Sequence, residues 1–251
     1  MTEEPQFVLE ERRENVVVLT LNRPERHHAL SLALSEQLAD ALVRASDDPS
    51  VACVIITGAG EKAFCAGGDM LEMSGVEQQA KRSNHAGGLF GALSRTPMPV
   101  IAAINGYCFG GGARLAIGCD IRLASETATF RLPGSEYGLV VAAATLPRLV
   151  GAERAKELIF TARKFTAGEA HRYGLVSELY TQAELLPAAW AMAQTIAGFS
   201  AGAVRGAKRV IDAATLSEAA EQLEDDLNRG LRGSDEQVAR FRDATRRVTG
   251  R

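Results

Sequence analysis

The sequence has no long uninterrupted apolar run. Its longest apolar stretch, residues 99–118 (PVIAAINGYCFGGGARLAIG), is broken by Asn105, Arg114 and several glycines, so we expect no membrane-spanning helix. The first residues, MTEEPQF, are acidic and lack the apolar core of a secretory signal peptide. The sequence therefore predicts a cytoplasmic protein.

Metal ligands at a recognisable spacing are also missing. The cysteines, Cys53, Cys65, Cys108 and Cys119, are too far apart in sequence for a zinc or redox pair, and each has apolar neighbours. We expect buried free thiols in a reducing compartment. Because the four histidines show no metal-ligand spacing either, we expect no metal site and no cofactor.

Positive charge is not in excess. The 251 residues carry 28 Lys and Arg against 31 Asp and Glu, a net charge of −3, and this balance argues against a nucleic-acid-binding protein. What remains is an ordinary globular composition, 46% hydrophobic and 24% charged. A chain of this length can build one large core, or a core with a small appended subdomain.

The pattern of apolar residues predicts an α/β fold. Ser31 is a predicted N-cap for a helix over 31–46, and residues 72–88 are polar enough for a mobile loop or a frayed helix. β-Type runs lie at 7–12, 15–22, 51–60, 99–106, 119–125 and 128–132, and helical patterns fill 183–199, 201–214, 216–230 and 235–247.

A strand, a glycine turn and a helix recur roughly every 45–50 residues, which indicates stacked units. We therefore divide the chain into a core over residues 1–180 and a C-terminal helical subdomain over 181–251. The subdomain is predicted to serve as a lid or as an oligomerisation layer.

Two glycine turns at strand ends are the candidate site. Gly67-Gly68 and Gly110–Gly112 would let backbone N–H groups approach a ligand where a Cβ would clash, although glycines also serve in tight packing turns. The second turn opens a helix, whose N-terminus attracts negative charge. Arg114 lies in the first turn of that helix, where a cation is unfavourable unless an anion offsets it.

Four motifs together resemble the crotonase superfamily, which contains the enoyl-CoA hydratases and isomerases. They are NRPERHHAL at 22–30, AFCAGGD at 63–69, NGYCFGGGARLAIGCD at 105–120 and F-x-x-P…GL at 130–139. The resemblance implies a crotonase-like spiral of ββα repeats with a C-terminal helical trimerisation region. It also implies homotrimers or dimers of trimers, and an acyl-CoA thioester as substrate.

By position, the resemblance assigns an oxyanion hole to the N–H groups of Gly68 and Gly111. Such donors stabilise the enolate that a thioester becomes on reaction. Asp69 matches a family position too, but we interpret it first as a cap for the following helix. The residues expected to bind substrate are Arg26, His28, Ala29, Ala66, Gly67, Gly68, Asp69, Met70, Gly110, Gly111 and Tyr137.

The chain departs from the resemblance at both acid–base positions. The two glutamates that the hydratases use fall at Arg114 and Gly134, and arginine is no base at neutral pH. Efficient hydration is therefore not expected. Isomerisation, decarboxylation or another thioester reaction stays open, and so does a catalytically silent acyl-CoA-binding protein that acts as a carrier, sensor or scaffold.

Arg114 needs an anion, and two hypotheses supply one. In the first, Glu136 pairs with Arg114 or reaches the acyl pocket as a displaced acid or base; the alternative is that Glu136 faces solvent or a subunit interface. In the second, Arg114 binds a carboxylate of the substrate itself. Tyr137 is either a hydrogen-bond donor in the pocket or a buried structural residue.

Three further positions carry weaker hypotheses. The backbone of the loop at Arg26 and His28 is expected near the pantetheine of coenzyme A, with Arg26 able to meet a phosphate, while a solvated loop is the alternative for these side chains. His85, in the 72–88 segment, is a further candidate, although an isolated loop histidine is seldom catalytic.

Overall fold

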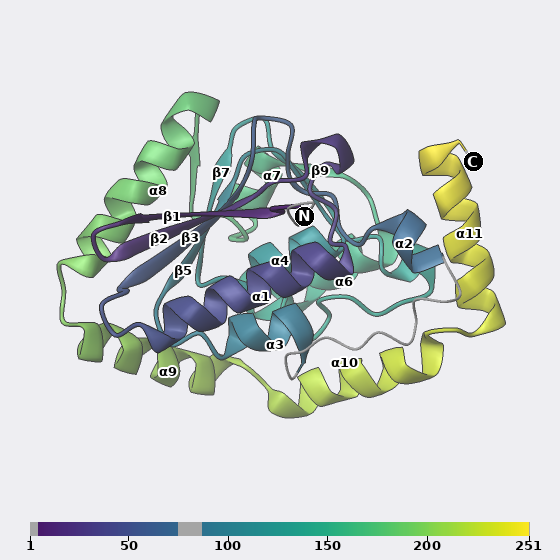
Figure 1. Cartoon of the computed structure of the whole chain (residues 1–251). Helices are drawn as coiled ribbons and strands as arrows, with labels where there is room; N and C mark the ends of the chain where they lie inside the picture. The colour runs from purple at the N-terminus through teal and green to yellow at the C-terminus, as the bar shows by residue number, and fades with distance from the viewer. Residues whose placement is uncertain (1–4, 75–86, 251) are drawn as a thin grey trace.

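The computed structural model describes residues 5–74 and 87–250, and its strands form two sheets (Figure 1). The larger sheet has the order β1-β2-β3-β5-β7-β10, with β1 (Val8–Arg13) antiparallel to β2 (Val16–Leu21) and the other pairs parallel. Strands β3 (Cys53–Gly58) and β5 (Val100–Ile104) are buried along their whole length. Their unbroken apolar sequences are typical of parallel strands that are covered on both faces.

The smaller sheet takes one short strand from each repeat. Its members are β4 (Ala63–Cys65), β6 (Tyr107–Phe109), β8 (Thr129–Arg131) and β9 (Phe165–Thr166). The chain passes from β3 to β4, from β5 to β6, and from β7 (Ile121–Ser125) to β8, each time leaving one sheet for the other. This confirms the predicted α/β spiral of ββα repeats.

The predicted regular spacing of the repeats is wrong. The second repeat begins at Val100 and the third already at Ile121, because only the short helix α4 (Gly111–Gly118) separates β6 from β7. The sequence patterns also predicted no helix or strand between 133 and 182. That segment holds η3 (Ser135–Tyr137), α5 (Pro147–Val150), α6 (Ala152–Thr161), β9, α7 (Ala167–Arg172) and β10 (Glu178–Tyr180).

Helices α1 (Leu32–Asp47), α3 (Gly88–Ser94) and α4 cover the core beside the candidate site (Figure 1). Ser31 caps α1 by accepting a hydrogen bond from the N–H of Leu34 at 3.2 Å, as predicted. Leucines at helical spacing, Leu34, Leu38 and Leu42, are then fully buried.

Close contacts to main-chain atoms hold the segments around the candidate site together. A Cβ at Gly112 would lie 2.2 Å from the carbonyl oxygen of Cys65, so only glycine fits there. Asn105 links the strand ends as well: its amide donates to the carbonyls of Gly58 at 2.9 Å and Gly60 at 2.7 Å, and accepts from the N–H of Gly58 at 3.1 Å. These contacts fix the ends of β3 and β5 and hold the start of α4 against β4.

Four helices complete the chain, as the periodicity predicts. Helix α8 (Gln182–Ala197) buries Leu185, Ala189 and Ala193 against the larger sheet. Helices α9 (Ala201–Thr215), α10 (Glu218–Leu231) and α11 (Asp235–Thr249) then run along the outside of the molecule, and α11 ends beside α2 (Met70–Ser74) (Figure 1). The division of the chain at residue 180 stays a prediction.

Across residues 5–74 and 87–250, no helix is long and apolar enough to cross a membrane. The same residues contain no group of three or more His, Cys, Asp or Glu that could hold a metal ion. All four cysteines are free and buried, as predicted. Burial raises the pKa of the Cys65 thiol to about 12, so this thiol is un-ionised and unreactive near the candidate site.

Candidate functional site

The loop before α1 lies against the first glycine turn. The N–H of Ala66 donates to the carbonyl of His27 at 2.9 Å, and the N–H of Leu30 donates to the carbonyl of Gly67 at 2.7 Å. A third bond runs from the N–H of Asp69 to the carbonyl of Leu30 at 3.1 Å. The predicted residues of the two segments, 28–29 and 66–69, are therefore side by side.

The two glycine turns also meet. A Cβ at Gly111 would lie 3.4 Å from the amide nitrogen of Gly68, and a Cβ at Gly67 would lie 3.3 Å from that of Gly111. Since the nitrogen and the Cβ position of one residue are about 2.5 Å apart, the nitrogens of Gly68 and Gly111 lie within about 6 Å of each other.

Both of these N–H groups are available. Within the described part of the chain, neither Gly68 nor Gly111 donates its backbone N–H to a hydrogen bond. Each residue is only half-buried, so a ligand can reach it. Two unpaired donors side by side at the start of a helix suit a single anionic oxygen.

Gly110 sets the direction of the second turn. Its φ of 51° and ψ of −116° belong to a region that L side chains rarely adopt. Its N–H donates to the carbonyl of Arg131 at 2.9 Å, while its own carbonyl accepts from the N–H of Arg114 at 2.9 Å and so begins α4. The chain thus changes from strand to helix within one residue, with the N–H of Gly111 left over.

Asp69 is a helix cap, as predicted. Its carboxylate accepts from the N–H groups of Leu71 at 3.1 Å and Glu72 at 3.3 Å, at the start of α2. It also forms a buried ion pair with Arg23, which the sequence analysis did not foresee. Burial opposes ionisation of Asp69, but the Arg23 hydrogen bond and the two amides outweigh it, so the pKa of Asp69 is lowered.

His28 is buried rather than part of a solvated loop. Only 1% of the residue is exposed, and both ring nitrogens are used. Nδ1 accepts from the N–H of Arg23 at 2.9 Å, so Nε2 carries the proton and donates to the carbonyl of Ala59 at 3.0 Å. Burial lowers the pKa of His28 against the opposing effect of the Ala59 carbonyl. Its side chain therefore holds the loop in place, whereas the nearby Arg26 is exposed.

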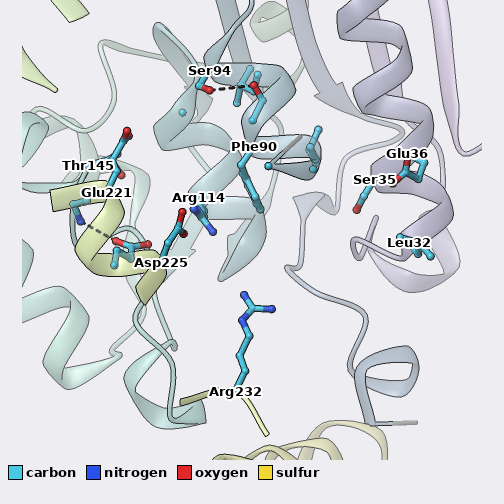
Figure 2. A pocket seen from close by; sticks show the side chains of 18 residues that line it. Leu32, Ser35, Glu36, Phe90, Ser94, Arg114, Thr145, Glu221, Asp225 and Arg232 are labelled. Carbon is cyan, nitrogen blue, oxygen red and sulfur yellow. Dashed lines mark hydrogen bonds between the residues drawn. The ribbon is translucent and has the colours of Figure 1, made fainter. Parts of the chain in front are cut away.

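A cavity of about 550 Å³ adjoins α4. Its walls come from α1, α3, α4 and α10, together with the segment around Thr145 (Figure 2). Arg114 lines it, with its guanidinium carbon 4.3 Å above the centre of the Phe90 ring. Arg232, just after α10, extends into the cavity toward Arg114 (Figure 2).

The predicted pairing of Glu136 with Arg114 is wrong. The Glu136 carboxylate pairs with Arg131 and, at 3.3 Å, with Arg247 of α11. These two guanidinium groups hold it where η3 meets α11, since Arg131 lies only five residues before it and α11 packs on η3. Tyr137 packs edge-on against Phe241 of α11, which accounts for the half-buried state of its ring, and burial raises its pKa.

The structure brings together some predicted site residues and adds others. Gly67, Gly68, Gly110, Gly111 and the 28–29 segment converge, and Met70 follows as the first residue of α2. His85 lies outside the described residues. The side chains that sequence reasoning missed are Phe90, Glu224, Asp225 and Arg232, all on cavity walls formed by helices distant in sequence.

Glu224 is a buried acid with a structural role. Its two carboxylate oxygens accept from the N–H groups of Ala142 at 3.0 Å and Ala144 at 2.9 Å. One turn further along α10, Asn228 accepts from the N–H of Val140 at 3.0 Å and donates to its carbonyl at 2.6 Å. These bonds attach α10 to the 140–144 segment and so hold one wall of the cavity.

The fold and the paired glycine turns define a class of protein, the crotonase-fold proteins, and comparison with known families agrees. The family model described as enoyl-CoA hydratase/isomerase matches residues 11–240. The chain therefore belongs to the enoyl-CoA hydratase/isomerase family.

Individual relatives are similar over most of their length. The chain is 40% identical to a crotonyl-CoA hydratase of Syntrophomonas wolfei, over 72% of this chain and 71% of the relative. It is 38% identical to a short-chain-enoyl-CoA hydratase of Clostridium acetobutylicum, over 82% and 80%. The crystal structure of an enoyl-CoA hydratase/isomerase from Pseudoalteromonas atlantica superimposes with a TM-score of 0.85 at 29% identity, over 95% of this chain and 97% of that one.

Proposed function

We propose that this chain is an enzyme that acts on an acyl-CoA thioester, whose carbonyl oxygen it holds between the N–H groups of Gly68 and Gly111. One observation carries the proposal: these two donors lie side by side and neither has a partner among the described residues. A thioester carbonyl gains negative charge when it becomes an enolate. Fixed donors stabilise that charge, each typically by about 3–4 kcal/mol in related oxyanion holes.

The acyl group would occupy the cavity beside α4, because Gly111 and the cavity-lining Arg114 are one helical turn apart. The loop at 26–29 would lie along the coenzyme A portion, with the exposed Arg26 free to meet a phosphate. Names of the relatives support an acyl-CoA substrate, since those similar to this chain include a crotonyl-CoA hydratase and a short-chain-enoyl-CoA hydratase.

We also propose that this chain does not hydrate enoyl-CoA efficiently and carries out a different reaction. Arg114 stands at one acid–base position, and at the other, Gly134, a Cβ would lie 2.9 Å from the carbonyl oxygen of Leu139 and from a methyl carbon of Val141. A glutamate at position 134 would therefore have no room for its Cβ in this backbone conformation. Isomerisation or another reaction through the enolate fits these residues better than addition of water.

Gly111→Ala tests the oxyanion site. The added methyl would lie 3.4 Å from the Gly68 nitrogen and 3.1 Å from a Leu30 methyl, filling the gap between the donors, while alanine suits the helix start. We expect turnover to fall about 100-fold, as on loss of one such donor, because the methyl keeps a carbonyl oxygen from reaching both N–H groups. If the wild type shows no turnover, we expect weaker acyl-CoA binding for the same steric reason. Calorimetry and single-turnover kinetics measure it.

Gly206→Ala is the matched control, because this glycine lies in the exposed helix α9 and a Cβ there meets nothing within 4 Å. The control is expected to behave as the wild type. Equal acyl-CoA affinity and turnover in Gly111→Ala and Gly206→Ala would contradict the proposed site.

A catalytically silent acyl-CoA-binding protein is the second candidate, favoured by the loss of both acid–base groups at 114 and 134. Incubation of the wild type with a panel of saturated, unsaturated and dicarboxylic acyl-CoAs, followed by mass spectrometry, separates the two. A new product supports the enzyme. Tight binding of the panel without any product supports the carrier, sensor or scaffold.

We also propose that the chain functions as a homotrimer or a dimer of trimers. Helix α9 buries no residue within the chain, and its Val210 and Ile211 are 70% and 59% exposed. On α10, Leu223 and Leu227 form an exposed apolar stripe at a spacing of four residues. Contiguous apolar surface of this kind favours burial against another chain.

A further inference from the structure

Two arginines, Arg114 and Arg232, face the same cavity. Arg114 comes from the first turn of α4, and Arg232 comes from the segment just after α10 (Figure 2). Among residues that the structure describes, neither forms an ion pair, and the recorded partner of Arg114 is the face of Phe90. Two cations near each other repel, and desolvation together with Arg114 lowers the pKa of Arg232.

The acids on the cavity walls do not resolve this repulsion. Glu224 is engaged by the N–H groups of Ala142 and Ala144. Asp225 points into the same space and attracts Arg232, but it makes no ion pair within 4 Å of either arginine. Glu221 and Glu36 belong to the walls formed by α10 and α1. The position between the two guanidinium groups is thus the place where an added negative group would be stabilised.

Two further features favour an anion there. The dipole of α4 is unfavourable for Arg114 on its own, and an anion beside it removes that cost. The Phe90 ring lies 4.3 Å from the Arg114 guanidinium carbon and attracts this cation, while the fork of N–H donors on a guanidinium matches a planar, two-oxygen group. A carboxylate has that shape.

We propose that the acyl group of the substrate ends in a carboxylate, which Arg114 and Arg232 bind together. The proposal rests on the proposed function, since it assumes that an acyl-CoA thioester occupies the site. It names the substrate class as dicarboxylic acyl-CoA thioesters, with the thioester carbonyl at Gly68 and Gly111 and the free carboxylate at the two arginines.

The wild-type chain provides the first test. Glutaryl-CoA and pentanoyl-CoA have acyl chains of the same length and differ in that one ends in a carboxylate. We expect glutaryl-CoA to bind about tenfold or more tightly in calorimetry, because a charge-assisted hydrogen bond is roughly twice as strong as a neutral one. Equal or tighter binding of pentanoyl-CoA would overturn the proposal.

Arg114→Met and Arg232→Met provide the second test. Each is expected to lower the affinity for glutaryl-CoA by about tenfold and that for pentanoyl-CoA by less than about threefold, and Arg114→Lys is expected to restore part of the loss. Arg229→Met is the matched control, since Arg229 lies on α10 near Arg232 but is 73% exposed and pairs with Asp226. An equal loss for both ligands in Arg114→Met and Arg232→Met would also overturn the proposal.

These measurements separate the inference from the function on which it rests. If pentanoyl-CoA binds and depends on Gly111 but glutaryl-CoA has no advantage, the carboxylate site fails and the acyl-CoA site stands. If neither ligand binds the wild type, both fail.

Discussion

His28 shows how one buried side chain holds the loop beside the site. The residue has a φ of 54°, a left-handed conformation that is uncommon outside glycine and asparagine, and its ring joins Arg23 to Ala59. The bond from the Arg23 N–H requires the neutral ring, because a protonated Nδ1 could no longer accept it, whereas Nε2 can donate to Ala59 in either protonation state. Folding therefore works against protonation of His28.

This gives a prediction about pH. Since the pKa of His28 in the folded chain lies below its ordinary value of about 6.5, the unfolded chain binds the proton more readily. The contribution of His28 to stability is complete above about pH 6.5 and is lost as the pH falls from there toward the lowered pKa. Urea unfolding at several pH values measures this loss in the wild type.

His28→Asn is the comparison variant, because asparagine tolerates the left-handed conformation and does not titrate. We expect a cost of about 1 kcal/mol at pH 8, from one lost hydrogen bond, and a smaller decline in stability below pH 6.5 than in the wild type. Identical pH profiles for the two proteins would show that His28 is not the titrating group.

At the scale of the element, helix α4 has an arginine at each end, in opposite circumstances. The positive charge of Arg114, at the start of the helix, interacts unfavourably with the helix dipole. The charge of Arg122, just beyond the C-terminus, interacts favourably with it. The Arg122 side chain is buried without a carboxylate and donates to backbone carbonyls instead, of Leu175 at 2.7 Å, Asp120 at 3.3 Å and Ala116 at 3.4 Å, and also of Cys119. It donates to carbonyl oxygens at the C-terminal end of α4 and in the segment after α7.

Arg122→Met should therefore destabilise the fold. We expect a loss of about 3 kcal/mol in the free energy of unfolding, since several buried carbonyls lose a charged donor. Arg122→Lys keeps the charge with fewer donors and should lose an intermediate amount. Denaturant titration followed by circular dichroism measures both, and a loss below about 0.5 kcal/mol in Arg122→Met would contradict this role.

Helix α10 illustrates an element held by polar contacts. Glu224 and Asn228 attach it to the 140–144 segment, while Leu223 and Leu227 on the same helix are 59% and 48% exposed. A surface helix usually buries its apolar stripe in its own chain. In α10 the buried side is polar, so the apolar side is available to a neighbour.

At the scale of the whole molecule, the proposed assembly can be tested on that stripe. We expect the wild type to migrate with the mass of three or six chains in size-exclusion chromatography with light scattering. Leu227→Glu should shift it to the single chain, because a buried unpaired carboxylate is costly. Leu186→Glu, on the exposed side of α8, is the control and should leave the mass unchanged.

A single-chain mass for the wild type, or an unchanged mass for Leu227→Glu, would contradict the assembly through α9 and α10. Far-ultraviolet circular dichroism of both variants verifies that the helices are retained.

The sequence was most informative where the fold depends on local pattern. Continuous β-branched runs predicted β3 and β5, and Ser31 predicted the start of α1, because burial and capping leave signatures within a few residues. Strands β9 and β10 were missed, since two or three residues carry no period. The spiral arrangement was predicted from the motifs that resemble a known family and not from the secondary-structure propensities of the residues.

The site was predictable only as far as its main chain. The glycine turns marked Gly68 and Gly111, since glycines adjacent in sequence are visible there. The partners of Arg114 were not, because Phe90 and Arg232 reach it from helices far along the chain, and Glu136 was chosen for its nearness in sequence alone. Long-range packing decides such neighbours.

Gly112 has a consequence for how this family of sites can change. Because its Cα lies against the backbone of Cys65 with no room for a methyl group, close approach of main chain sets the spacing between α4 and β4. The side chain at position 114, in the same first turn of α4, can therefore differ without disturbing this spacing. Substitutions can thus change the reactive side chains of such a site one at a time while the backbone that positions them stays the same.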